Sequence, residues 1–122
     1  MLVRYKKACE KIAMGLLSFM PEHKDIKRLM QTIQLYEQSE QWILYLWKKD
    51  EEYVGAIGLK FEGDTAVIQH ITVIPSYRGE GVGTEMVTEL LELNQFDSIG
   101  AVDESQPFIQ KCITMLKEAD AK

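Results

Sequence analysis

One stretch of this sequence, Val73-Ile-Pro-Ser-Tyr-Arg-Gly-Glu-Gly-Val-Gly83, lies between an apolar β-type run and an amphipathic helical run. Its glycines at positions 79, 81 and 83 leave the main chain uncovered, so the amides there can approach a charged ligand closely. The first amides of the following helix lack intrahelical partners, and the helix dipole favours an anion there. The stretch therefore predicts a phosphate cradle at a strand-to-helix turn.

Two common phosphate-binding motifs do not match this loop. A dinucleotide fingerprint would need its third glycine at Thr84 or at Met86, depending on the register, and a Walker A loop would need Gly-Lys-Ser/Thr. What remains is Arg78-x-x-Gly81-x-Gly83. A glycine-rich turn that binds no ligand is the structural alternative at this point.

The flanking sequence predicts one domain over residues 1–122, with the element order β-α-α-β-β-β-α-β-α. We expect strands at 2–5, 41–47, 53–61, 65–73 and 98–102, with hairpin turns at 48–52 and 62–64. Gly55 and Gly58, within one strand, suggest a bulge or a close backbone approach. The first two helices have apolar stripes, and two more helices are expected at 82–93 and 108–116. The stripes are Ala8, Ile12, Ala13, Leu16, Leu17 and Phe19, then Ile26, Leu29, Met30, Ile33 and Tyr36.

Composition narrows the classes of function. The chain has 122 residues, of which 46% are hydrophobic, and a net charge of −5, which argues against non-specific nucleic-acid binding. Cys9 and Cys112 lack metal-ligand spacing, so no metal is expected. The apolar run at 12–20 is too short to span a bilayer, and no signal cleavage site follows it. We therefore expect a cytoplasmic protein that does not contact membranes.

In this context the glycine-rich motif resembles the signature of the GNAT N-acetyltransferases, Q/R-x-x-G-x-G/A, and the element order is similar over nearly the whole chain. The resemblance implies an α+β GNAT fold, with a mixed central sheet flanked by helices and truncated at the C-terminus. It also implies acetyl-CoA (coenzyme A) as the cofactor. Main-chain groups of Ile71 and Val73 would pair with the pantetheine arm. The pyrophosphate would lie against the loop residues Arg78, Gly79, Gly81, Val82, Gly83 and Thr84. Arg78 is alternatively an ordinary exposed arginine.

Three further stretches resemble a small bacterial branch of that family associated with riboflavin-synthesis genes: residues 1–7, 11–21 and 108–112. The acceptor implied is an amine, on a small molecule or on a protein. Its identity and the oligomeric state are left open.

The catalytic half of the site departs from the family pattern. Family members often carry Glu or His at the positions of Val67 or Gln69. His70 has suitable chemistry, but strict strand alternation places it on the opposite face unless a bulge turns it, so a structural histidine is the alternative. The tyrosine common in the last helix is replaced by Ile109, and Cys112, one turn later, is either near the pantetheine or simply buried. Two functions therefore stay open: an N-acetyltransferase using water-mediated deprotonation, or a coenzyme A-binding sensor or interaction protein with little catalysis.

Overall fold

A computed structural model describes residues 1–20, 24–63, 65–93 and 98–101. The elements are β1 (Leu2–Arg4), η1 (Lys7–Cys9), α1 (Glu10–Leu17), α2 (Ile26–Gln38), β2 (Trp42–Lys49), β3 (Glu52–Glu62), β4 (Thr65–Val73), η3 (Pro75–Tyr77), α3 (Val82–Glu92) and β5 (Ser98–Ala101). This order matches the prediction through β5. The helix expected at 108–116, with Ile109 and Cys112, lies outside the described residues. None of the described helices has the length and apolar character needed to cross a membrane.

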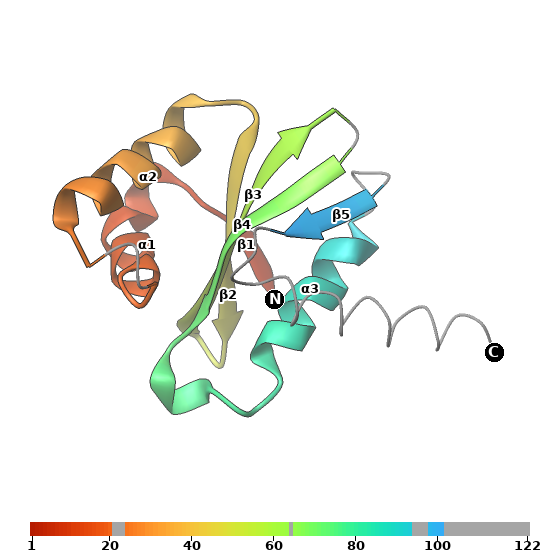
Figure 1. The fold of residues 1–122 in the computed structure, drawn as a ribbon. Coiled ribbons are helices and arrows are strands. Elements are labelled where there is room, and N and C mark those ends of the chain that lie inside the picture. The colour runs from red at the N-terminus through yellow and green to blue at the C-terminus, as the bar shows by residue number, and fades with distance from the viewer. Residues whose placement is uncertain (21–23, 64, 94–97, 102–122) are drawn as a thin grey trace.

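The five strands form one mixed sheet in the order β1-β2-β3-β4-β5. The first four strands run antiparallel, and β5 pairs in parallel with β4. Helices α1 and α2 cover one face and α3 covers the other (Figure 1), and each face has its own apolar cluster. The predicted α+β class, a mixed sheet flanked by helices, is confirmed.

The buried stripes of α1 and α2 differ from those expected. In α1 the buried residues are Ala13, Leu16 and Leu17, whereas Ile12 is 40% exposed. Phe19 is also exposed, because α1 ends at Leu17 and the helical periodicity no longer applies to it. In α2 the buried stripe is Leu29, Ile33 and Tyr36, at i, i+4 and i+7. Ile26 and Met30 were expected on that stripe but are exposed, since Ile26 begins the helix and Met30 is rotated about 100° from Leu29.

The first hairpin is tighter than the predicted turn at 48–52. Strands β2 and β3 continue to Lys49 and Glu52, which leaves Asp50 and Glu51 as the turn. Both have positive φ, 51° and 69°, as the type I′ two-residue hairpin turn requires. The charged residues around the turn therefore extend the ladder instead of ending it.

A β-bulge interrupts β4 at Gln69. Gly58 and Leu59 are adjacent on β3, yet they pair with His70 and Ile68, which are two residues apart on β4. Ile68 consequently joins the apolar cluster of α3, while His70 contacts Tyr36 of α2 on the other face. The expectation from strict alternation, that Ile68 and His70 share a face, is wrong, because the extra residue reverses the alternation.

Gly58 provides the close approach expected of it. A Cβ at Gly58 would lie 1.9 Å from the hydroxyl of Tyr36, and a Cβ at Gly55 would lie 3.1 Å from the sulfur of Met86. The two glycines therefore let α2 and α3 pack closely against opposite faces of β3.

Candidate functional site

A cavity of about 450 Å³ opens where β4 runs into the loop before α3. The eight residues predicted to hold the cofactor all line it: Ile71, Val73, Arg78, Gly79, Gly81, Val82, Gly83 and Thr84. The structure thus brings together the β4 edge and the glycine-rich loop. Residues that the sequence did not single out complete the wall: Phe19, Met20, Thr72 and Tyr77.

The β4 side of the cavity is a strand edge that no described residue of β5 covers. β5 pairs with residues Thr65 to Ile68, and its described register ends there, one residue before the bulge. Beyond that point, the N–H of Ile74 donates to Val54 O of β3. The N–H and C=O groups of the preceding residue, Val73, therefore point away from β3. Among the described residues no strand covers this edge, and a ligand with amide groups could pair with it as an added strand would.

The glycine-rich loop has the backbone geometry of an anion site. Gly79 and Gly81 have φ of 84° and 81°, in the left-handed region that favours glycine. Gly81 is the N-cap of α3 and offers no side chain to its first turn. The first helical bond runs from Glu85 N to Gly81 O, so the amides of Val82 and Gly83 precede the ladder. Successive amides in such turns form concave sites for phosphate.

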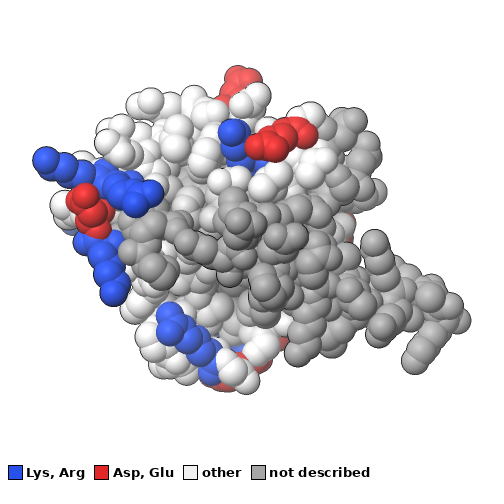
Figure 2. All heavy atoms as spheres, in the orientation of Figure 1, with Lys and Arg blue, Asp and Glu red and all other residues white. Residues whose placement is uncertain are grey.

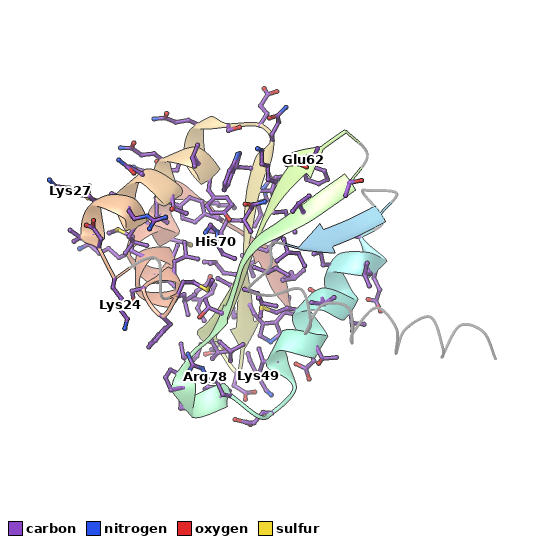
Figure 3. All side chains as sticks on the ribbon, in the orientation of Figure 1. Lys24, Lys27, Lys49, Glu62, His70 and Arg78 are labelled. Carbon is purple, nitrogen blue, oxygen red and sulfur yellow. The ribbon has the colours of Figure 1, made fainter. Side chains whose placement is uncertain are left out.

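Arg78 is the charged side chain among the described residues that line this cavity. Its Nε donates to Val73 O over 2.9 Å, and its Cζ lies 5.9 Å from the ring centroid of Phe19. Figure 3 shows Arg78 at the end of the sheet where the loop begins. The guanidinium thus lies at the cavity beside the glycine-rich loop and is bonded to a main-chain carbonyl of the β4 edge.

Tyr77 anchors the same loop to the first hairpin. Its hydroxyl donates to Glu52 Oε2 over 3.1 Å, and this hydrogen bond is the main reason why the pKa of Tyr77 is raised. The contact ties the loop to β3 and helps to hold its backbone in the geometry just described.

On the α1/α2 face, the sheet carries a buried polar pair. The hydroxyl of Tyr36 lies 2.6 Å from Nδ1 of His70, and both residues are 7% exposed. Figure 3 shows His70 between the sheet and the α1/α2 layer. Thr72, two residues further along β4, is also buried and lines the cavity. The predicted catalytic candidate His70 therefore lies near the cavity but is not part of its lining. Cys112, the other candidate, falls outside the described residues.

Among the described residues in Figure 2, several Lys and Arg side chains lie beside a charge of opposite sign. One network joins the end of β1 to α2: Tyr5 Oη donates to Glu37 Oε1 over 2.6 Å, and Lys7 Nζ lies 3.3 Å from the same carboxylate. The hydrogen bond from Tyr5, aided by Lys7, lowers the pKa of Glu37. Burial and Glu37 together raise the pKa of Tyr5.

Known proteins share this fold and much of this sequence. The model of the acetyltransferase (GNAT) family matches residues 10–101. The chain is 47% identical over 113 residues to an uncharacterized N-acetyltransferase in the lysA 3′ region of Bacillus methanolicus, with 92% of this chain and 94% of the relative covered.

Solved structures share the fold at low identity. Aminoglycoside N-acetyltransferase AAC(6')-Iy in complex with CoA superposes with a TM-score of 0.73 at 13% identity, covering 95% of this chain and 85% of that chain. An acetyltransferase of Trypanosoma brucei gives a TM-score of 0.67 at 18% identity, with 91% and 89% covered. At these identities the likeness concerns the fold.

Proposed function

This chain belongs to the GNAT family of acetyltransferases, and on that premise we propose that it transfers the acetyl group of acetyl-CoA to an amine. The observation that carries the proposal is the single cavity lined by all eight residues expected to hold the cofactor. The family supplies the acyl-CoA dependence. The choice of acetyl-CoA and of an amine as acceptor is the proposal.

Coenzyme A would lie along the open edge and the loop. Its pyrophosphate would be held by the amides around Gly79, Gly81 and Gly83, with Arg78 beside it. Its pantetheine arm would run along β4 and pair with main-chain groups of Ile71 and Val73. The direction of the Val73 peptide groups, away from β3, supports this arrangement.

Direct transfer needs an unprotonated amine, a donor to the oxyanion and a proton for the leaving thiolate. The oxyanion donor would be a main-chain amide of β4 around Val73. His70 is the one ionisable side chain of β4, and we propose it as the group that accepts the proton from the amine. The bulge supports this role, because it puts His70 on the same face as Val67, one of the two positions where family members often carry Glu or His.

The acceptor follows from the narrower resemblance in the N-terminal and C-terminal stretches. They are similar to RibT, a small GNAT protein associated with bacterial riboflavin-synthesis genes. We propose an amine of a flavin-pathway molecule, or of a neighbouring enzyme, as the acceptor.

Two measurements on the purified chain test the proposal. Titration calorimetry should show CoA binding, and acetyl-CoA should raise the melting temperature because it binds the folded state. Thiol release from acetyl-CoA should then be followed over a panel of amines, with flavin-pathway amines included. No binding at millimolar CoA would contradict the cofactor site. Binding without thiol release across the panel would favour a coenzyme A-binding role with little catalysis.

A further inference from the structure

A second cavity, of about 400 Å³, lies between the end of β1 and α2. β1 is the first strand of the sheet, whereas the cofactor cavity opens on β4, three strands further along. Among the described residues, the two cavities have no lining residue in common. Small-molecule sites have volumes of about 300–1,000 Å³. The second cavity is therefore large enough for a ligand of its own.

The charged residues that line this cavity carry an excess of positive charge. They are Arg4, Lys6, Lys7 and Glu37, three positive charges against one negative charge, which gives a net charge of +2. The whole chain has a net charge of −5. The local charge is thus opposite in sign to that of the molecule, and it attracts anions to this place on a surface that otherwise repels them.

Two of the three cations have no counter-charge among the described residues. Lys7 Nζ lies 3.0 Å from Glu10 Oε2 and 3.3 Å from Glu37 Oε2, so its charge is already balanced. Arg4 and Lys6 form no ion pair within the described part of the chain. Both are exposed, and a single exposed cation is commonly just solvated. Here, however, two of them line one concave site.

Hydrogen bonds to two neighbouring elements hold the walls of the cavity in place. Tyr5 N–H donates to Leu44 O over 2.9 Å, which ties the chain after β1 to β2. Tyr5 Oη donates to Glu37 Oε1 over 2.6 Å, which ties the same residue to α2. Lys7 adds its ion pair with Glu37. Because the walls are already ordered, a ligand would not bear the cost of ordering them.

The uncharged lining fits the body of an organic molecule. Leu44 is 1% exposed and provides an apolar wall, and Tyr5 and Tyr36 add two aromatic residues. A bare inorganic anion would leave most of the volume empty, since one water molecule takes about 30 Å³ of liquid volume. The cavity therefore combines two free cations with space for an aromatic or apolar group.

We propose that this cavity binds a small organic phosphate. Its phosphate group would lie between Arg4 and Lys6, and its body against Leu44. A phosphate monoester carries about −1.5 to −2 charges at pH 7, which matches the net charge of the lining. Arginine contacts phosphate through a planar fork and lysine through a point charge, so the two complement each other. A carboxylate would neutralise one of the two cations and leave the other.

The first experiment titrates the uniformly ¹⁵N-labelled full chain with phenyl phosphate at physiological ionic strength, where long-range attraction is screened. Saturable amide shift changes are expected at residues 4–7, 37 and 44. Changes confined to the loop at 78–84, or no saturable change with millimolar phenyl phosphate, would overturn the proposal. The site does not depend on the proposed function, so a chain that binds no coenzyme A would still show these shifts.

The second experiment compares two double variants that lose the same charge. Arg4→Gln with Lys6→Gln removes the two free cations of the cavity. The matched control is Lys27→Gln with Arg28→Gln, two exposed residues of α2 that do not line it; Figure 3 shows Lys27 on α2. The Kd for phenyl phosphate should rise about tenfold or more in the first variant and stay unchanged in the control. An equal rise in both, with both folded, would show general charge attraction and overturn the site.

Two further probes test the chemical class of the ligand in the wild type. Benzoate has the same ring with a single charge, and inorganic phosphate has the charge without a ring. Each should bind about tenfold more weakly than phenyl phosphate, because each lacks one of the two features that the cavity offers. Benzoate binding equally tightly would overturn the choice of phosphate. Inorganic phosphate binding equally tightly would overturn the organic body.

Discussion

Replacing Gly81 by alanine separates the cost of backbone strain from the loss of cofactor binding. Gly81 has a φ of 81° and caps α3, and a Cβ there would meet no heavy atom within 4 Å. The substitution therefore causes no clash in the free protein. The left-handed conformation alone costs about 1–2 kcal/mol for a residue with a Cβ, which corresponds to roughly 4–8 °C in melting temperature for a chain of this size.

Gly63 provides a matched control for this strain. It has a φ of 63° in the β3–β4 hairpin, a Cβ there would likewise meet no heavy atom within 4 Å, and it does not line the cavity. Gly63→Ala and Gly81→Ala should therefore lower the melting temperature by similar amounts. Any difference between them in CoA affinity comes from the methyl group in the loop.

The affinity should fall only in the loop variant. A methyl on Gly81 would hold the pyrophosphate away from the nearby amides, and a hydrogen bond to a charged group contributes about 1.5–3 kcal/mol. We expect the Kd for CoA to rise roughly 10- to 150-fold in Gly81→Ala and to stay unchanged in Gly63→Ala, by titration calorimetry. Equal Kd values for the two variants, with both folded, would refute the placement of the phosphate cradle.

Three shorter predictions concern other parts of the molecule. Arg78→Met should weaken CoA binding about tenfold, because the guanidinium would lie beside the pyrophosphate, but it should not weaken the binding of acetyl-pantetheine, which has no phosphates; equal weakening of both ligands in calorimetry would contradict this. The pKa of Glu37 is lowered in the folded protein. The stabilisation that its carboxylate gives the fold is therefore present above the unfolded pKa of about 4.3 and is lost as the pH falls through the folded pKa. Urea unfolding should therefore show the gap between wild type and Glu37→Gln closing on acidification, and a gap constant with pH would refute it. Gly58→Ala should destabilise by about 1–3 kcal/mol because its methyl meets the Tyr36 hydroxyl, whereas Gly15→Ala, with open space around it, should not destabilise.

The loop was predictable because the residues that determine its conformation are neighbours in the sequence. The glycines, the preceding strand and the following amphipathic helix are contiguous in sequence, and together they fix a strand-to-helix turn with open amides. The antiparallel pairing of β2, β3 and β4 also followed from short turns, since the residues at 62–64 leave no room for anything but a hairpin. The cavity lining added Phe19 and Met20, which come from a segment far from the loop in sequence. Nothing in their immediate sequence marks them as part of a site.

The face of His70 was not predictable from alternation, because it depends on how β3 and β4 pair. A register shift between Gly58 and Leu59 is a property of two strands, and the sequence of β4 alone keeps an unbroken pattern. The burial pattern hides it as well, since even-numbered residues are buried before and after the bulge, first against α3 and then against α2. The contact with Tyr36, 34 residues away, resolves the ambiguity.

The bulge at Gln69 decides which face of the sheet His70 occupies. Before it, Ile68 packs in the apolar cluster under α3. The same extra residue turns His70 toward α2, where Gly58 leaves room for the hydroxyl that contacts it. A regular strand of the same composition would direct this histidine into the apolar cluster under α3, with no partner from α2. The orientation of the proposed base therefore depends on one backbone feature, and a change that restores regular pairing there should remove the contact between His70 and Tyr36.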